Sequence, residues 1–536
     1  MGGRISEKAL VKQATILVTA GLLVRLLGFA YRLPMTAILD DAGNAAYSAG
    51  FQIYNFLLIL SSAGLPATIG KMVSERLALK QYKNAHKVFI VALVGCGIIS
   101  FLFMIVMFVF AEFIAVNICG IHNAEYTIRT LAPTVFIVGI MSVFRGYFQG
   151  MNNMMPTAIS QIIEQIFNAI FSVLLAWMFI GKGVEFGAAG GTTGTGIGAV
   201  FGLAVLLCGY TFIKPKIKKK VDLPIDYREE TVGEIGTTLV RIAVPIIIGT
   251  AMFSITNLAD LGLAMDRLEA SGAFVYEEAE ILYGQLHGKY ALLTTLPIAI
   301  STAMATATIP SLAASVALKE MVAIKRKINL IIKLAMMVSI PAAVGLGVLA
   351  QPIFHLLFPT TPDGWELMSI GSVAIIFLSL NQIVTGILQG LGKVKIPAIN
   401  AAVGAVVKIT LNYMLIVIPA INIKGAIIST TVCYMLVSIL NVIALVKTVK
   451  FVPDLVGALV KPIISALVMG VICYFSYLLL DMAGIGNTVS TLAAIVIGIG
   501  VYGIVMLLIK GISKEEISAM PMGNKMIPMF EKLRLI

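Results

Sequence analysis

The sequence predicts an all-α integral membrane protein with about fourteen transmembrane helices, arranged as two six-helix lobes followed by two extra C-terminal helices. Three observations support this prediction. Apolar stretches long enough to cross a bilayer follow one another along nearly the whole chain. Most of the 39 lysines and arginines stand in alternate gaps between these stretches. The first twelve stretches also form two sets that repeat the same residues at a nearly constant spacing.

The composition leaves no room for a large soluble domain. Hydrophobic residues are 59% of the chain, charged residues are 12%, and the mean hydropathy is +0.98. Backbone amides in hydrocarbon must be hydrogen-bonded within the protein, so these stretches should be helices, whereas a barrel would show short alternating strands. The predicted helices cover residues 10–34, 46–69, 88–112, 129–150, 157–180, 187–213, 236–262, 286–312, 329–351, 367–390, 397–418, 425–447, 456–480 and 488–510.

The basic gaps predict a topology. Lysines and arginines gather in every second gap, as in 71–87 and 214–228, so the positive-inside rule places these gaps and both termini in the cytoplasm. The net charge of +12 is spread along short loops, which favours contacts with anionic lipids over nucleic-acid binding. The first apolar stretch contains Arg25 and lacks a small-residue cleavage site, so we expect no cleavable signal.

An internal repeat predicts the domain organisation. Ser61, Gly146 and Gly187 begin short blocks that recur, in the same order, at Ser301, Gly386 and Gly425. Six spans per repeat give both lobes the same orientation, and parallel repeats of this kind are a transporter architecture. The expected parts are an N-lobe (1–213), a basic cytoplasmic linker (214–235), a C-lobe (236–450), and a last pair of helices with a tail (451–536). The acidic stretch 266–284 faces outward and is expected to form a short surface helix.

Arg25 is the first candidate for a functional residue. It lies in the middle of the first predicted span, where a charge costs roughly 2.5–3.5 kcal/mol even on the lenient scale. A guanidinium at that depth should face an aqueous cavity or a partner. The alternative is a shifted helix from which Arg25 reaches a lipid head group.

Glu164 and Lys408 form the next candidate pair, because they lie in equivalent helices of the two lobes. The repeat aligns Lys408 with Asn168, one turn beyond Glu164. The carboxylate and the ammonium could meet across a closed cavity and separate on opening. Alternatively, each is held by neighbours within its own lobe.

Other charged and flexible positions are candidates for gates and hinges. Asp40, Asp260 and Lys289 are gate candidates near the outer ends of spans, although Asp260 and Lys289 are more simply interpreted as solvated helix ends. Arg145, near the inner end of the fourth span, is interpreted as a topogenic charge. The hinge candidates, which packing explains about as well, are Pro66, Pro245, Pro310 and Gly187.

Signatures of enzymes and cofactors are scarce. The four histidines have no metal-ligand spacing, and the sequence has no P-loop, GxSxG or HExxH motif. We therefore expect a transporter without a catalytic site, cofactor or resident metal. Its energy source would be an ion gradient (Na⁺ or H⁺), the membrane potential or the gradient of the substrate.

Three segments resemble a known family. Arg25-Leu26-Leu27-Gly28-Phe29-Ala30 with Arg32 is similar to the first helix of lipid II flippases. The segments 60–66 and 282–288 resemble the stage V sporulation protein B branch, within the multidrug/oligosaccharidyl-lipid/polysaccharide exporter superfamily. The resemblance covers the whole chain. It implies a V-shaped molecule that works by alternating access, with a central cationic cavity for a diphosphate-sugar head group and a groove at the extra helices for the polyprenyl tail.

The resemblance also implies a role and partners. Arg25, Arg32, Glu164, Asn168 and Lys408 would line the cavity, and the protein would act in the bacterial cytoplasmic membrane, beside cell-wall synthesis proteins. Lipid II is the first candidate substrate. However, Leu58 and Ile59 follow Asn55 where the best-known lipid II flippases carry two arginines, so a related lipid-linked saccharide, including an exopolysaccharide precursor, fits as well.

Two other functions are weighed against a flippase. A cation-coupled multidrug exporter of the same superfamily would have twelve helices and acidic residues in its core, whereas this sequence has two more helices and Arg25. A membrane enzyme acting on lipid-linked sugars would need a catalytic loop, for which only 266–280 offers carboxylates. The two-lobe repeat favours a transporter.

Overall fold

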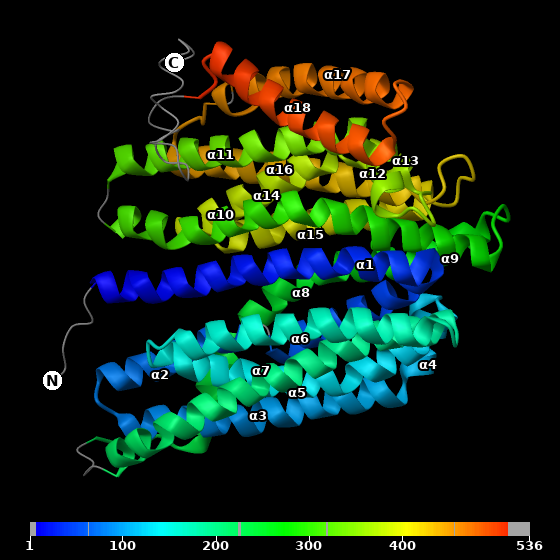
Figure 1. Cartoon of the computed structure of the whole chain (residues 1–536). Coiled ribbons are helices and arrows are strands. Elements are labelled where there is room, and N and C mark those ends of the chain that lie inside the picture. Colours follow the sequence, from blue (N-terminus) through cyan, green and yellow to red (C-terminus); the bar gives the residue numbers. More distant parts are fainter. Residues whose placement is uncertain (1–6, 63, 223–226, 318–319, 455, 513–536) are drawn as a thin grey trace. The chain divides into compact units, whose positions relative to one another are not determined.

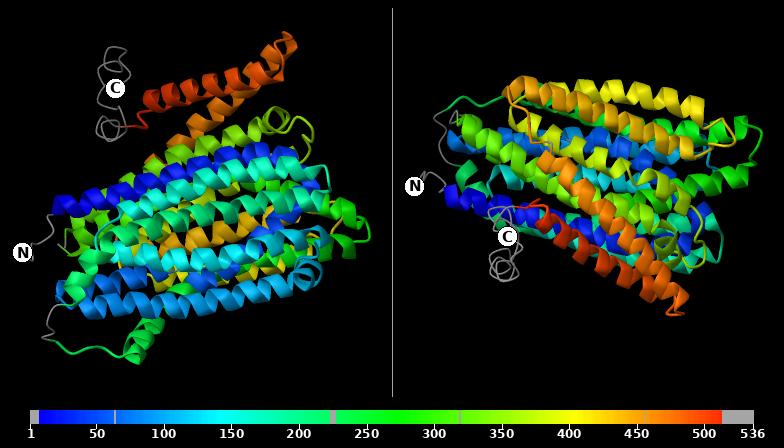
Figure 2. Two further views of the ribbon diagram at one scale, coloured as in Figure 1. Left: turned by 60° about the horizontal axis from the view of Figure 1, so that its bottom comes forward. Right: turned by 90° about the horizontal axis from the view of Figure 1, so that it is seen from above.

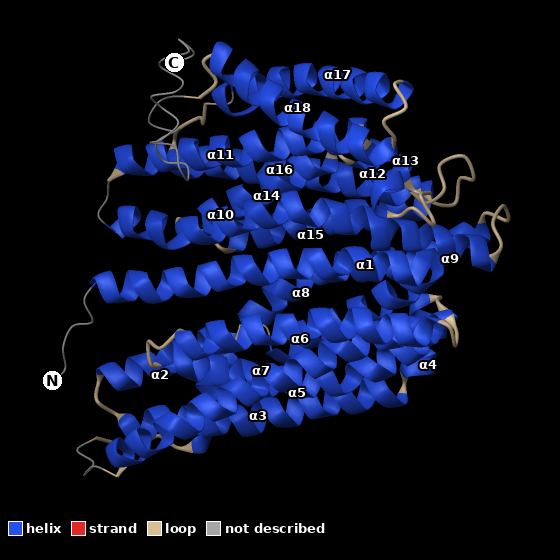
Figure 3. Ribbon diagram, viewed as in Figure 1, coloured by secondary structure: helices blue, strands red, loops and turns tan. Residues whose placement is uncertain are grey.

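The computed structural model describes residues 7–62, 64–222, 227–317, 320–454 and 456–512, and every regular element among them is a helix (Figure 3). The chain divides into two compact units, Met1–Gly288 and Lys289–Ile536, and each is considered by itself. An all-helical membrane protein is therefore confirmed. Residues 513–536 of the predicted tail lie outside the described residues.

The first unit contains nine α-helices, three short helical turns and the longest helices of the chain. These are α1 (Glu7–Ser62), α2 (Leu65–Ala78), α3 (Tyr82–Val109), α4 (Ala111–Phe113), η1 (Ile114–Cys119), η2 (His122–Ala124), α5 (Glu125–Gly150), α6 (Met155–Ile180), α7 (Val184–Val221), α8 (Val232–Ala270), α9 (Tyr276–Gly284) and η3 (Gln285–Tyr290), whose last two residues belong to the second unit.

The second unit holds the remaining helices. They are α10 (Ala291–Ala317), α11 (Met321–Val348), α12 (Ala350–Leu357), α13 (Trp365–Gly371), α14 (Ala374–Gly390), α15 (Lys395–Leu415), α16 (Lys424–Val449), η4 (Val456–Val460), α17 (Lys461–Met482) and α18 (Asn487–Leu508). The last two, α17 and α18, lie side by side (Figures 1 and 2).

A sharp turn at Asp40 divides α1 into two arms. Asp40 has φ 52° and ψ −170°, which is not helical backbone. Arg32 and Tyr47 are fifteen positions apart and would be separated by about 22 Å along a straight helix. Instead the Arg32 guanidinium carbon lies 4.7 Å from the centre of the Tyr47 ring. The arms therefore fold back on one another, as two separate predicted spans require.

The predicted repeat is visible in how corresponding glycines pack. A β-carbon added to Gly146 on α5 would lie 2.9 Å from the Cα of Pro66 on α2. Its counterpart Gly386 on α14 is packed equally tightly, with Ala305 Cβ of α10 at 2.9 Å. Each position accepts only hydrogen, so each pair of helices approaches closely. The two units thus share a local architecture that comes from the same residues.

Helices lie on each of the fourteen predicted stretches, but the number of membrane crossings is not confirmed. Among the described residues, ten helical runs are long and apolar enough to cross a membrane, or eleven if the bent pair α13 and α14 forms one span. One of these runs, Leu23–Ala78, includes both arms of α1 and also α2. The boundary between predicted lobes also stays a prediction, since α8 is grouped here with the first unit.

Candidate functional site

Glu164 forms an ion pair inside its own unit. Its Oε2 lies 2.6 Å from Arg145 Nη2, and the same Arg145 nitrogen donates to Ser160 Oγ at 3.0 Å. Ser160 in turn donates to the Gly202 carbonyl of α7. The short turn between α5 and α6 brings Arg145 and Glu164 to the same level of the bundle. Of the two alternatives for Glu164, a partner from its own lobe is the one that these contacts provide.

Asn168, one turn further along α6, joins three helices. Its amide nitrogen donates to the Tyr31 hydroxyl of α1 at 3.3 Å, and its Oδ1 accepts from Ser172 and from Thr195 of α7. The side chain is only 7% exposed. Buried amides need such partners, so Asn168 holds α1, α6 and α7 in register.

Arg32 lies in the fold between the two arms of α1. Its guanidinium stacks against Tyr47 and lies 5.9 Å from the centre of the Phe51 ring. Among the described residues its buried Nε has no hydrogen-bond partner. A guanidinium that is held by aromatic rings and keeps an N–H donor without a partner is suited to binding an anionic ligand. Arg25 lies two turns earlier on the same arm and is exposed.

The predicted gate residues have different surroundings. Lys289 is fully buried and donates to the carbonyls of Thr361 and Asp363, the latter at 3.2 Å. Asp260 on α8 is only 5% exposed. The interpretation of Asp260 and Lys289 as solvated helix ends is therefore wrong, because both side chains are buried. Asp40 is exposed at the turn of α1. Lys408 lies in α15 of the second unit and is 3% exposed.

The hinge candidates lie at helix ends or within helices. Pro66 stands in the first turn of α2, two residues after Gly64, whose φ is 79°. Gly187 is packed against Ile180 across the α6–α7 turn, so packing explains this glycine. Pro245 and Pro310 fall within α8 and α10, but their side chains lie outside the described residues.

The segment 282–288 contacts the second arm of α1. Tyr283 accepts a hydrogen bond from Gln52 at 2.8 Å, and Gln285 donates to Asp41 at 3.3 Å. Gly284 and Gly288 make room for this contact, because a β-carbon on Gly284 would lie 1.8 Å from the Asp41 carbonyl oxygen. The expected helix in 266–284 is α9. It is a docked element, since Tyr283 is fully buried.

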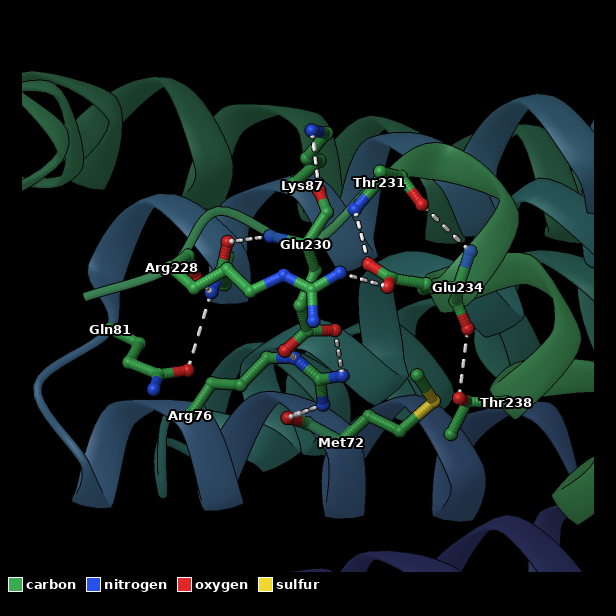
Figure 4. A network of polar contacts seen from close by, with 10 residues as sticks. Met72, Arg76, Gln81, Lys87, Arg228, Glu230, Thr231, Glu234 and Thr238 are labelled. Carbon is green, nitrogen blue, oxygen red and sulfur yellow. Dashed lines mark hydrogen bonds and ion pairs between the residues drawn. The ribbon is translucent and has the colours of Figure 1, made fainter.

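A second polar network fixes the segment before α8, which we call the strap (residues 227–231). Arg76 of α2 donates to both carboxylate oxygens of Glu230 (Figure 4). Lys87 of α3 donates to the Glu230 carbonyl at 2.6 Å, and Lys83 pairs with Glu229. Thr231 then caps α8 through a reciprocal pair of hydrogen bonds with Glu234. The strap joins the α2–α3 hairpin to the first turn of α8.

The second unit contains an apolar groove beside the two extra helices. It has a volume of about 390 Å³ and is lined mainly by α11, α17 and α18, including Pro341, Gly345, Met469 and Ile499. Tyr502 also lines the groove, but its hydroxyl is hydrogen-bonded within the protein, because it donates to the Met337 carbonyl. Such a lining suits a long hydrocarbon chain without polar groups.

Sequence reasoning undervalued some residues of these networks. Arg145 was interpreted as a topogenic charge, yet it pairs with Glu164. Its spacing from Glu164 across one short turn is a signal that could have found the pair. The pairing of Arg76 with Glu230 joins residues that are far apart in sequence, and no local pattern predicts it.

Comparison with known proteins gives consistent matches. A family model for polysaccharide biosynthesis proteins matches residues 10–316, and the MatE model matches residues 290–414. The membrane protein YabM of Bacillus subtilis is 27% identical, over 96% of this chain and 95% of its own. From the same organism, stage V sporulation protein B is 24% identical (98% and 100%) and the lipid II flippase MurJ is 24% identical (79% and 80%).

Solved structures share this fold. An inward-facing multidrug resistance MATE family transporter of the MOP superfamily has a TM-score of 0.67 at 16% identity, covering 82% of this chain and 98% of its own. The lipid II flippase MurJ in an inward closed conformation has a TM-score of 0.62 at 17% identity, covering 92% and 98%.

Proposed function

Because the chain belongs to the polysaccharide biosynthesis protein family of the multidrug/oligosaccharidyl-lipid/polysaccharide exporter superfamily, we propose that it flips polyprenyl-diphosphate-linked saccharides. The protein is a multi-pass membrane transporter, like the flippase and the exporters that it resembles, and it is not an enzyme. The proposed membrane is the bacterial cytoplasmic membrane, the mechanism is alternating access, and undecaprenyl diphosphate is the expected carrier lipid. The peptidoglycan precursor lipid II is the first candidate.

The observation that carries this proposal is the groove between α11 and the extra helices α17 and α18. A substrate with a polyprenyl tail needs apolar surface for that tail while its head group crosses the bilayer. The MurJ structure also matches a larger share of this chain than the MATE transporter does, 92% against 82%. The C-terminal pair of helices thus supports a lipid-linked substrate over a small drug.

The head group would be bound by cations. A diphosphate carries several negative charges, and guanidinium groups bind such groups through two parallel hydrogen bonds. Arg32 supports this role because its buried Nε has no partner among the described residues. Arg25, exposed two turns away on the same arm, is a further candidate. An Na⁺ or H⁺ gradient or the membrane potential would drive the cycle.

Lipid binding by the purified full-length protein tests the proposal. Native mass spectrometry should show an undecaprenyl-diphosphate adduct. Gly345→Phe should lower its occupancy, because Gly345 lines the groove and its β-position has no neighbour closer than 3.8 Å. Gly500→Phe is the matched control, since nothing lies within 4 Å of that position and it does not line the groove. Absence of an adduct, or equal occupancy in both variants, would contradict the proposal.

A growth assay tests the cationic site separately. Arg25→Ala should abolish rescue of a flippase-depleted bacterium while the protein remains in the membrane. Full rescue by Arg25→Ala would remove Arg25 from the site.

A drug exporter is the second candidate function, and the match of the MatE model to residues 290–414 favours it. It predicts gradient-dependent efflux of an organic cation such as ethidium from proteoliposomes. Efflux without any polyprenyl-diphosphate adduct would replace the flippase proposal with this one.

A further inference from the structure

The first unit has a cavity of about 280 Å³ at its basic end, where α3 and α5 approach the end of α7. The positive-inside rule assigns this end to the cytoplasm. Tyr82, Tyr147 and Asn153 contribute polar groups to its wall, while α7 contributes mainly apolar side chains and one lysine. The cavity lies in a different unit from the apolar groove of α17 and α18.

The end of α7 directs one lysine into this cavity. Ile213, Ile217 and Lys220 line it, and their spacing of four and three residues places them on one face of the helix. The Lys220 ammonium also lies 5.2 Å from the centre of the ring of Tyr82, which lines the same cavity. Lys219 and Lys220 are both exposed, but only Lys220 lines the cavity.

Among the described residues, the lysines at this end of α7 have no acidic ion-pair partner. These lysines are Lys214, Lys218, Lys219 and Lys220. The nearby lysines of α3 have partners within the protein, because Lys83 pairs with Glu229 and Lys87 donates to the Glu230 carbonyl. The surplus positive charge is therefore concentrated at α7, beside the cavity.

The surroundings are those of a membrane surface. Phe212, one residue before the cavity lining begins on α7, is 81% exposed, and Leu79 in the α2–α3 turn is 67% exposed. Tyrosines such as Tyr82 and Tyr147 are typical of the level of lipid head groups. A ligand at this place would meet a cationic, hydroxyl-bearing cavity and exposed apolar side chains next to it.

We propose that this cavity binds the phosphate of an anionic phospholipid head group, with Lys220 as its charge partner and with acyl chains against the apolar side chains beside it. A phosphodiester is the shared chemistry of such lipids and of soluble glycerol phosphates. The exposed Phe212 and Leu79 favour the lipid, because a soluble ester has no use for an apolar surface. Basic pockets between helices at the cytoplasmic surface bind lipid head groups in this way. This site is independent of the transported substrate.

The test is a lipid titration of the full-length protein by native mass spectrometry. Phosphatidylglycerol should bind more tightly than phosphatidylcholine. Lys220→Gln should weaken phosphatidylglycerol binding about fivefold, which corresponds to the roughly 1 kcal/mol of one lysine near an anionic surface. Lys220→Arg should retain binding, because it keeps the charge.

Lys219→Gln is the matched control, since it removes the same charge one residue away from the cavity face. It should change binding less than twofold, because the Lys219 side chain does not line the cavity. Equal losses in the two glutamine variants, or no preference for phosphatidylglycerol, would overturn the site. Competition by glycerol 1-phosphate at the concentration at which the lipid binds would assign the cavity to a soluble phosphate ester and overturn the lipid assignment.

Discussion

Arg76 and Glu230 form a bidentate ion pair between α2 and the strap. Arg76 Nε lies 3.0 Å from Glu230 Oε1, and Arg76 Nη2 donates to Oε2. Arg76 Nη1 also donates to the Met72 carbonyl of its own helix, and its side chain is only 10% exposed. All three interactions restrain one guanidinium, so this pair is a strong attachment of the strap to the α2–α3 hairpin.

Arg76→Ala should therefore destabilise the first unit by about 1.5–3 kcal/mol, the range for hydrogen bonds to charged groups. Thermal unfolding in detergent micelles measures the loss, and adding Glu230→Ala to the same chain should cost little more. Lys71→Ala is the control, because its exposed pair with Glu75 spans 3.9 Å and is worth about 0.5 kcal/mol or less. Equal losses for the two single variants would show that the Arg76–Glu230 pair contributes no more stability than an exposed ion pair.

Arg145 and Glu164 should behave as a unit in transport. Neutralising either one leaves the other charge half-buried without its partner, so Glu164→Gln and Arg145→Gln should each reduce activity strongly. The swap of Arg145→Glu with Glu164→Arg should retain more activity than either single variant. Complementation of a flippase-depleted strain, with membrane levels checked by immunoblot, compares the three. A swap that is no better than the single variants would count against direct pairing.

Gly194→Ala should disrupt the contact between α6 and α7. The added β-carbon would lie 2.2 Å from the Ser172 backbone nitrogen, so the helices must move apart, at a cost of about 1–3 kcal/mol or more. Gly500→Ala on α18 is the matched control, because nothing lies within 4 Å of its β-position. It should be neutral or stabilising by up to about 1 kcal/mol. The two unfolding temperatures in detergent should differ accordingly.

Glu280 should make the docking of α9 depend on pH. Burial raises the pKa of Glu280, although the hydrogen bond from Asn123 lowers it. A raised pKa in the folded state means that the favourable contribution of Glu280 is complete below its unfolded pKa and is lost as pH rises through the folded value. Glu280→Gln, which stays neutral, should remove this dependence.

The measurement for Glu280 is the unfolding temperature of wild type and Glu280→Gln between pH 4 and pH 8. The stability of the wild type relative to the variant should fall as pH rises through that range. A difference that does not change with pH would mean that the Glu280 carboxyl has the same pKa in the folded and unfolded chain.

The sequence by itself determined the helices, their repeat and the short helix α9. These features depend on local properties: apolar length, the alternation of basic gaps, and small residues at matched positions such as Gly146 and Gly386. Each can be recognised in a single segment, because a helix in hydrocarbon satisfies its own backbone.

Only the tertiary structure decided which side chains meet. It paired Glu164 with Arg145 and Arg76 with Glu230, buried Lys289 among backbone carbonyls, and docked α9 on the second arm of α1. These contacts join segments that are apart in sequence, and they depend on the rotation and depth of each helix. Hydropathy restricts the rotation and the depth of a helix but determines neither of them. The pairings therefore follow from how the packed helices fit together.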